Sequence, residues 1–352
     1  MFMEKIDIQD FLELRKTFPV IDVRSPGEYQ KAHIPGAYNI PLFSNEERSK
    51  VGITYKQTGR LAAIKEGLKI VGSKMLDMVE NAEEIAGGQR AVILHCWRGG
   101  MRSENMAWLF SRVGIKPYVL TGGYKNFRRY CRKQLEKPAT LIVLGGYTGS
   151  GKTEILHAIR GEGEQCLDLE GLARHKGSVF GSFGEEEQLP NEHFENLLFE
   201  EWLKLELNKP VWVEDESKMI GQNCLPDELF HRMRSAPVIK AELDKPIRIK
   251  RLFREYACFD KQLLKDSIQK IRRRLGGQNA QKAIEALDHD DFYTAIDITL
   301  RYYDKAYQHG LNKRENAAIY PVTLNGDDPG IDASRLIEKA YQLLKPEREL
   351  RS

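Results

Sequence analysis

LIVLGGYTGSGKTEIL, residues 141–156, is the most specific pattern in this 352-residue chain. An apolar run typical of a buried strand leads into a glycine-rich loop and then into helical spacing. Residues 146–153 satisfy GxxxxGK[ST], in which backbone N–H groups, a helix N-terminus and a lysine surround a phosphate. The pattern predicts a phosphate or diphosphate site formed by Gly146, Thr148, Gly149, Ser150, Gly151, Lys152 and Thr153.

The motif leaves the ligand of this loop open. A nucleotide is the commonest ligand, but ATP is not established by the motif. The hydroxyl of Thr153 is compatible with Mg²⁺, and the acidic end of VWVEDES, residues 211–217, offers Asp215 or Glu214 to order that ion or its water. An apolar strand that ends in acids is equally common in α/β domains without this role. We predict no complete set of protein metal ligands.

The second half of the chain continues as an α/β pattern. Strands are predicted at residues 165–170, 210–215 and 237–243, and the region beyond about residue 260 is mainly helical. Candidate site residues follow the first of these strands, where α/β folds place ligand-binding loops; they are Arg174, His175 and Ser178. Ordinary loop positions explain these three residues equally well.

The first half also alternates short apolar runs with helical spacing, as in residues 18–24, 90–95 and 116–123. This order predicts an α/β domain with a mostly parallel sheet. A basic helical stretch ends at Lys137-Pro138, so the predicted domains are 1–137 and 138–352.

HCWRGGMRS, residues 95–103, is the second chemical signal. It follows an apolar strand pattern and precedes helical spacing, so its cysteine is expected at the entry to a helix N-terminus, where N–H groups and arginines favour thiolate over thiol. The Cys-x5-Arg spacing leaves room for a tetrahedral, phosphate-like anion. The candidate nucleophile is Cys96, with Arg98, Gly99, Gly100, Met101 and Arg102 as its anion loop. The alternative, a buried structural cysteine, requires neither the glycines nor the arginines.

Composition excludes several classes of protein. Hydrophobic residues make up 41% and charged residues 30%, which is typical of soluble globular domains. Acids near the N-terminus and strand-sized apolar runs argue against a signal peptide and a membrane span, so we expect a cytoplasmic protein without a membrane partner. Five cysteines without CxxC spacing argue against a disulfide framework or a zinc site.

Positive charge is concentrated in two stretches, although the formal net charge is only +3. Residues 122–137 and 245–274 are rich in Lys and Arg with aromatic residues between them, which suits a phosphate backbone and exposed bases. A solvated helix face explains either stretch about equally well. The predicted RNA contacts are Lys125, Arg128, Arg129, Arg132, Arg248, Lys250, Arg251, Arg254, Arg272, Arg273 and Arg274.

Two segments of the first half resemble the rhodanese domain, a family whose cysteine carries sulfur or selenium. These are IDVRSPGEYQKAHIPGAYNIP, residues 21–41, and the cysteine loop. A rhodanese domain ahead of a P-loop domain resembles the bacterial tRNA 2-selenouridine synthases, and the likeness continues through residues 51–72 and 173–202. It implies a rhodanese-like domain followed by a P-loop NTPase-like α/β domain with a helical C-terminal region.

The resemblance also implies a reaction in two steps at the wobble 2-thiouridine of tRNA. Geranyl diphosphate first alkylates the sulfur, and selenium from selenophosphate then replaces it. Cys96 is implied to carry selenium as a selanyl-cysteine, and the P-loop to bind a diphosphate. The expected partners are therefore tRNA, selenophosphate and geranyl diphosphate.

Several further residues have a functional and a structural interpretation. Asp22, Arg24 and His33 match the rhodanese pattern, but a structural role is favoured for them. Lys56, Gln57 and Arg60 either touch RNA or solvate a helix. A prenyl pocket near Phe292, Tyr302, Tyr303 and Tyr307 is less favoured than ordinary core packing.

Two other functions fit part of the sequence. A thiosulfate sulfurtransferase or cysteine phosphatase fused to a P-loop kinase would use both motifs but leaves the basic stretches unexplained. A non-catalytic RNA-binding protein would need neither Cys96 nor Lys152.

Overall fold

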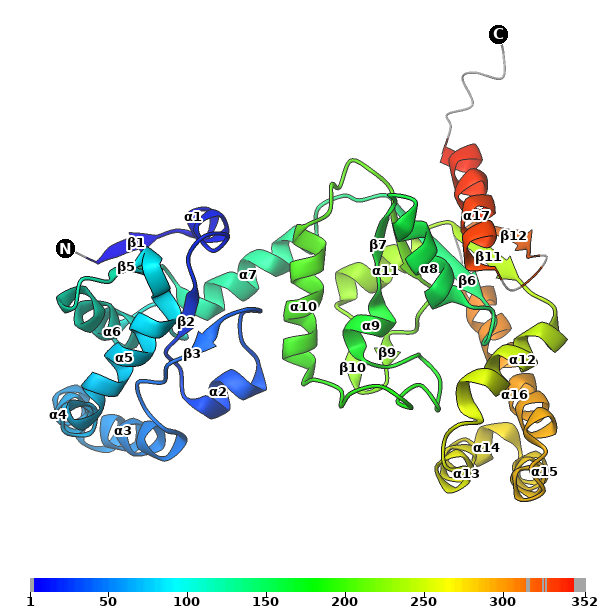
Figure 1. The fold of residues 1–352 in the computed structure, drawn as a ribbon, viewed down its shortest axis with the longest axis horizontal. Helices are drawn as coiled ribbons and strands as arrows, with labels where there is room; N and C mark the ends of the chain where they lie inside the picture. Colours follow the sequence, from blue (N-terminus) through cyan, green and yellow to red (C-terminus); the bar gives the residue numbers. More distant parts are fainter. Residues whose placement is uncertain (1–2, 315–316, 325, 327, 345–352) are drawn as a thin grey trace, which may run out of the picture. The chain divides into compact units, whose positions relative to one another are not determined.

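The computed structural model describes residues 3–314, 317–324, 326 and 328–344. The chain forms two compact units, Met1–Gln134 and Leu135–Ser352, which we call the first and second unit (Figure 1). The predicted boundary, between residues 137 and 138, lies just beyond this division.

The first unit is built on a five-stranded sheet in the order β1-β5-β4-β2-β3, with every neighbouring pair parallel. Its strands are β1 (Glu4–Ile6), β2 (Val20–Asp22), β3 (Tyr38–Asn39), β4 (Ala91–His95) and β5 (Lys116–Leu120). Its helices are α1 (Ile8–Leu14), α2 (Pro26–Lys31), α3 (Asn45–Thr58), α4 (Arg60–Val71), α5 (Met75–Ala86), α6 (Met101–Arg112) and α7 (Gly123–Leu135), with short 3₁₀ turns η1 (Gly72–Lys74) and η2 (Gly87–Gln89). The predicted mostly parallel α/β domain is confirmed.

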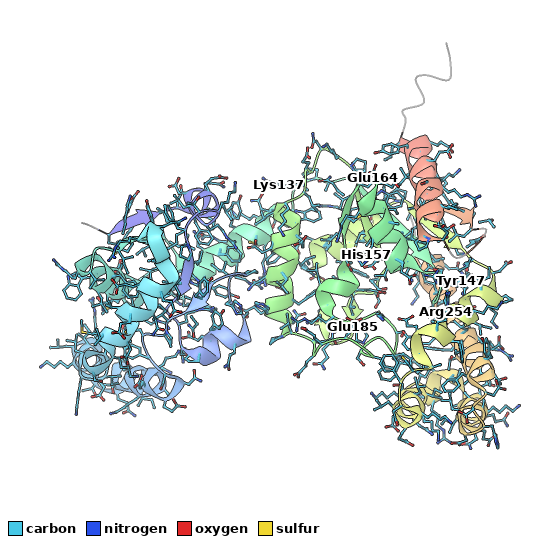
Figure 2. The ribbon with its side chains drawn as sticks, in the orientation of Figure 1. Lys137, Tyr147, His157, Glu164, Glu185 and Arg254 are labelled. Carbon is cyan, nitrogen blue, oxygen red and sulfur yellow. The ribbon has the colours of Figure 1, made fainter. Side chains whose placement is uncertain are left out.

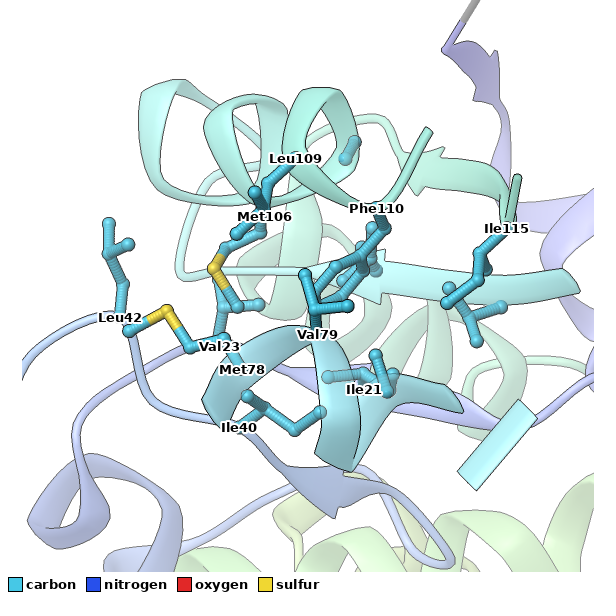
Figure 3. Close-up of a cluster of buried hydrophobic side chains, with 14 of the residues drawn as sticks. Ile21, Val23, Ile40, Leu42, Met78, Val79, Met106, Leu109, Phe110 and Ile115 are labelled. Atoms are coloured by element: carbon cyan, nitrogen blue, oxygen red, sulfur yellow. The ribbon is translucent and has the colours of Figure 1, made fainter. Parts of the chain in front are cut away.

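The core of the first unit packs β2 and β4 against α5 and α6 (Figure 3). Ile21, Met78, Met106 and Phe110 are among its buried side chains. All five residues of β4 are buried, as expected for a strand inside a parallel sheet with covered faces. Side chains of β4 itself are therefore closed off from solvent, and this segment can reach an open site only beyond the end of the strand, where the cysteine loop begins.

The second unit has another five-stranded parallel sheet, in the order β12-β11-β6-β8-β7. Its strands are β6 (Leu141–Gly146), β7 (Gln165–Leu167), β8 (Val211–Glu214), β11 (Val238–Glu242) and β12 (Ile319–Thr323), beside an antiparallel pair, β9 (Met219–Ile220) and β10 (Asn223–Cys224). Because β6 is the central strand, the P-loop that follows it emerges between the ends of β8 and β11.

The helices of this unit include a C-terminal group that Figure 1 shows around α16. The helices of the whole second unit are α8 (Lys152–Gly161), α9 (Leu169–Ala173), α10 (Asn191–Leu203), α11 (Asp227–Ser235), α12 (Lys245–Tyr256), α13 (Lys261–Lys270), α14 (Arg272–Leu275), α15 (Gly277–Asp288), α16 (Phe292–Asn312) and α17 (Pro329–Leu344). No helix in the described residues is long and apolar enough to cross a membrane.

Two details differ from the sequence prediction. The strand predicted at residues 165–170 ends at Leu167, because Asp168 accepts a hydrogen bond from the Gly171 N–H (2.7 Å) and caps α9. The helical C-terminal region also contains β12, an edge strand with no fully buried residue and hence little sequence signal.

Candidate functional site

The cysteine loop connects β4 to α6 in the first unit. Cys96 directly follows the buried strand, and α6 begins at Met101. The Cys96 side chain is almost fully buried, and its Sγ accepts hydrogen bonds from the Gly100 N–H (3.3 Å) and the Ser103 hydroxyl (3.4 Å). The loop therefore directs hydrogen-bond donors onto the sulfur.

These donors change the protonation of the sulfur. Burial alone raises the pKa of Cys96, but hydrogen bonds from the Ser103 side chain and from the backbone of Ser103, Arg98 and Gly100 lower it below the ordinary cysteine value. A thiolate is the nucleophilic form of cysteine, so the loop provides an activated nucleophile. All five cysteines of the chain are free thiols.

The two arginines of the loop have different surroundings. Arg102 forms an ion pair with Glu28 (2.8 Å), which also accepts a hydrogen bond from the backbone N–H of Ser25. Arg98 lies at the exposed side of the loop. Hydrogen-bond donors, above all the Ser103 hydroxyl, favour the thiolate. Ser103 belongs to the motif HCWRGGMRS, but its place in the first turn of α6 was the only sequence signal for this role.

The start of α7 holds the cysteine loop in place. The backbone N–H groups of Tyr124 and Lys125 donate to the carbonyl oxygens of Cys96 (2.9 Å) and Trp97 (3.0 Å). Gly99 and Gly123 both have positive φ, and a Cβ on either would overlap backbone atoms of the other segment. The loop thus has a rigid backing with no room for side chains.

The residues that match the rhodanese pattern have structural contacts. Asp22 and Arg24 form a buried bidentate ion pair (2.6 Å at the shortest contact), and Arg24 lies 4.0 Å above the Tyr124 ring. Opposite charge and hydrogen bonds from Arg24 oppose the effect of burial, and the pKa of Asp22 is lowered. His33 contacts the Tyr29 carbonyl oxygen through Nδ1 (2.9 Å). These contacts support the sheet edge next to the loop.

The P-loop borders a cavity of about 1050 Å³ in the second unit. Lys152 is the first residue of α8, and its Nζ donates to the Gly146 carbonyl oxygen (3.3 Å). Gly151 has φ +80°, and a Cβ there would overlap the Arg251 guanidinium. His157 and Arg254, labelled in Figure 2, border the same cavity from α8 and α12.

The cavity collects the predicted phosphate-binding residues and one serine from the loop after α9. Those on its wall are Gly146, Thr148, Gly149, Gly151, Lys152, Thr153 and Ser178. Ser150 is buried beneath the loop. Arg174 instead pairs with Glu186 (2.9 Å), and the His175 N–H donates to the Glu170 carbonyl oxygen (3.0 Å). The three candidates after β7 therefore have different surroundings.

The two predicted acids differ as well. Glu214 is fully buried and accepts hydrogen bonds from the backbone N–H groups of Leu169 (3.0 Å) and Glu170 (3.1 Å). Burial and the nearby carboxylates of Glu170 and Asp168 raise the pKa of Glu214 to about 8. Asp215 borders the cavity, where it pairs with Arg314 and accepts a hydrogen bond from the Tyr307 hydroxyl (3.0 Å).

Glu170 is one of four glutamates at the cavity that the sequence prediction missed, with Glu154, Glu216 and Glu255. Its carboxylate accepts a hydrogen bond from the Thr153 hydroxyl (2.9 Å) and borders the cavity. Among the described residues, no three His, Cys, Asp or Glu side chains converge as a metal site. Since Mg²⁺ is commonly held by one or two protein groups and substrate phosphates, Thr153 and Glu170 are the residues that would hold it.

The basic residues separate into two groups. Lys125, Arg129 and Arg132 on α7, Lys250 on α12 and Arg272, Arg273 and Arg274 on α14 are exposed, and Arg128 is half-buried. Arg251 and Arg254 border the P-loop cavity, and Arg251 also pairs with Glu154.

Arg248 does not fit the prediction of an RNA contact. It is 3% exposed, pairs with Asp304 through both guanidinium N–H₂ groups, and its Nε donates to the Thr148 carbonyl oxygen (3.0 Å). The Arg248 guanidinium therefore bonds to the P-loop backbone and lies away from solvent. The prediction was wrong because a Lys/Arg-rich run does not reveal which turn of a helix faces inward.

The C-terminal aromatic residues mainly pack in the core around α16, as favoured. Phe292 and Tyr303 border a small cavity of about 40 Å³. Tyr302, Tyr303 and Tyr307 also form one wall of the P-loop cavity. An aromatic wall and the P-loop thus border the same cavity.

Comparisons with known proteins match both units. The model of the rhodanese-like domain matches residues 7–130, and that of the tRNA 2-selenouridine synthase AAA domain matches residues 139–325. The chain is 33% identical to the tRNA 2-selenouridine synthase of Nitrosomonas europaea, over 84% of this chain and 90% of that one. It is also 33% identical to the enzyme of the same name from Bdellovibrio bacteriovorus, over 88% and 93% of the two chains.

Proposed function

Because the chain belongs to the tRNA 2-selenouridine synthase family, it is an enzyme of tRNA selenouridine modification, and we propose that it works in two steps, one at each loop. Geranyl diphosphate alkylates the sulfur of wobble 2-thiouridine at the P-loop, and selenophosphate exchanges that sulfur for selenium at Cys96. The observation that supports this division most strongly is the contrast between an activated cysteine in one unit and a large cavity bordered by the P-loop and Lys152 in the other.

In the first step, the diphosphate is a leaving group. The C1–O bond of the prenyl diphosphate breaks, the thiouridine sulfur bonds to C1, and the N3 proton passes to solvent. Lys152, Arg251 and the P-loop N–H groups lie where they would stabilise the charge on the departing diphosphate. Tyr302 and Tyr303 offer the allylic chain an aromatic wall.

In the second step, alkylation has made the sulfur a leaving group. Selenium bonds to C2, the C2–S bond breaks, geranyl thiol departs, and water takes the phosphoryl group to give phosphate, so the exchange needs no net oxidation. A selanyl-cysteine would need an oxidant, because the selenium of selenophosphate is already fully reduced, so we assign Cys96 the phosphoryl group. Its thiolate attacks phosphorus, the P–Se bond breaks to release the selenide that bonds to C2, and water then hydrolyses the S–P bond. The loop suits this anion because its backbone N–H groups and the N-terminus of α6 favour negative charge, with Arg98 exposed beside them.

The exposed arginines and lysines of α7, α12 and α14 are assigned to the tRNA backbone, and the tRNA substrate implies a cytoplasmic location. Neutralising phosphates releases counterions, so the affinity for tRNA is expected to fall steeply with salt. Filter binding at several salt concentrations measures this, and a flat dependence contradicts the assignment.

Nucleoside mass spectrometry tests the whole scheme. The full-length protein is incubated with 2-thiouridine tRNA, geranyl diphosphate and selenophosphate. We expect 2-selenouridine from the intact protein and only the geranylated nucleoside from Cys96→Ala. If the intact protein changes no nucleoside, but cleaves an aryl phosphate or transfers sulfur from thiosulfate to cyanide, the phosphatase or sulfurtransferase alternative replaces this proposal.

A further inference from the structure

The first unit carries an apolar groove beside the cysteine loop that the two steps above leave without a role. It lies between α3, α4 and α6 and has a volume of about 820 Å³. This volume falls within the range of small-ligand pockets, roughly 300–1,000 Å³. Ile64, Leu68, Met106 and Trp108 are among the side chains that line it.

Several large apolar side chains of the groove are open to solvent. Leu68 is 67% exposed, Trp108 is 52% exposed and Ile53 is 51% exposed. A concave surface that gathers such side chains marks a binding site more often than a packing accident. An apolar ligand would cover them.

The groove begins at the cysteine loop itself. Met101 and Arg102 line the groove, and the Gly100 N–H just before them donates to the Cys96 sulfur. A chain attached to an atom that reacts at Cys96 would therefore meet an apolar surface at the next residue of the loop.

The charged residues that line the groove limit which molecules could bind in it. Every charged residue that lines it is basic: Arg48, Lys56, Arg60 and Arg102. Arg48 and Arg102 share one carboxylate, that of Glu28, so the rim keeps a net positive charge. A second copy of the chain would bring these cations against their own counterparts, because a two-fold interface pairs the same patch with itself. An apolar chain that belongs to a polyanion matches both the walls and the rim.

We propose that this groove binds the ten-carbon prenyl chain of the S-alkylated nucleoside while C2 of that nucleoside lies at Cys96, with the basic rim against tRNA phosphates. The inference rests on the proposed function, since it requires the geranylated intermediate. It adds a second apolar site, separate from the P-loop cavity, and makes the chain a recognition element of the selenium step. The first unit would then select alkylated over unmodified thiouridine.

The test uses the full-length protein, selenophosphate and tRNA that already carries S-geranyl- or S-methyl-2-thiouridine at the wobble position. The variant Leu68→Gln/Trp108→Gln makes the groove polar. Leu61→Gln is the matched control, because Leu61 is also on α4 and is 66% exposed but does not line the groove. Leu68→Met keeps the groove apolar. Initial rates give kcat and KM for each substrate.

We expect the intact protein to have a KM at least about tenfold lower for the S-geranyl substrate than for the S-methyl substrate, because more apolar surface is buried. The double variant should raise the S-geranyl KM about tenfold and leave the S-methyl KM unchanged, whereas Leu61→Gln and Leu68→Met should retain the preference. Equal losses on both substrates, or a preference that survives the double variant, overturn the inference. If the intact protein selenates 2-thiouridine directly and ignores the S-geranyl substrate, the proposed function itself fails.

Discussion

Cys96 and Lys152 occupy comparable places in the two units. Each follows a buried strand of a parallel sheet, near the N-terminus of a helix. The first loop uses its donors to hold a thiolate, whereas the second keeps its lysine on the wall of a large cavity. The same backbone geometry therefore supports a nucleophile in one unit and a binding site in the other.

The titrating groups around the loops are shifted in opposite directions. Hydrogen bonds lower the pKa of Cys96, which favours its charged form, while burial and nearby carboxylates raise the pKa of Glu214 to about 8, which favours its neutral form. A neutral Glu214 adds no negative charge beneath the loop that is proposed to bind a diphosphate. The difference shows that burial alone does not set protonation: hydrogen-bond donors outweigh burial at Cys96, whereas neighbouring carboxylates add to it at Glu214.

The two units differ most clearly at Cys96 and Cys166, two of the three buried cysteines. Burial raises the pKa of Cys166 to about 12, so Cys166 stays a thiol. We expect Cys96→Ala to lower formation of 2-selenouridine from S-geranyl tRNA by at least about 10³-fold, since it removes the nucleophile, and Cys166→Ala to leave it nearly unchanged. Nucleoside mass spectrometry measures both. Comparable losses would mean that the thiolate is not special.

The variant Lys152→Ala tests whether the P-loop and the cysteine loop serve different steps of the reaction. Removing this charge should slow geranylation by about 10²-fold and leave selenation of S-geranyl tRNA unaffected. Lys209→Ala is the control, because Lys209 is exposed, lies outside the basic stretches and does not border the cavity. The rates of the two half-reactions are measured separately. A loss confined to selenation would reverse the assignment of steps to loops.

Ser103→Ala tests how the first loop favours the thiolate. Loss of the hydroxyl should raise the pKa of Cys96 and lower its alkylation rate near pH 7 about tenfold, since less thiolate is present. The pH profile of iodoacetamide modification at Cys96, read by peptide mass spectrometry, measures this. Ser111→Ala, on the same helix with its hydroxyl bonded to the Trp108 carbonyl oxygen, should leave the profile in place. An unshifted profile for Ser103→Ala contradicts the role of the hydroxyl.

Glu214→Gln has the smallest expected effect. Between its ordinary pKa and about 8, Glu214 binds a proton in the folded state but not in the unfolded state, so the free energy of unfolding falls as pH rises through this window. Glutamine cannot lose that proton, and the variant should gain a few degrees in Tm over the parent between pH 6 and pH 9. Thermal unfolding measures the gain, with exposed Glu228→Gln as the control. A constant difference across this pH range would show that Glu214 is ionised.

The sequence predicted the parts of both sites that depend on local spacing. Strand, loop and helix follow one another around Cys96 and Lys152 as expected, because buried strands and glycine loops leave strong local patterns. The partners that come from elsewhere in the fold were missed. Glu170 reaches Thr153, and Glu28 reaches Arg102, only because the chain folds back.

The sequence also did not reveal whether a basic side chain points into the fold or toward solvent. Arg248 and Lys250 lie two residues apart on α12, yet one is buried beneath the P-loop and the other is exposed. Composition treats them alike. Only the packing of α12 and α16 decides which cation serves the fold and which can meet RNA.

The close approach of Gly99 to Gly123 has a consequence for mutation. Alanine at either position would push its methyl group into backbone atoms of the other segment. The addition of one methyl group is therefore expected to displace the anion loop, even though Cys96 itself is unchanged. The presence of both glycines in an amino-acid sequence therefore indicates an intact loop. A relative that keeps the cysteine but replaces either glycine would be a candidate for a protein that still folds and no longer transfers selenium.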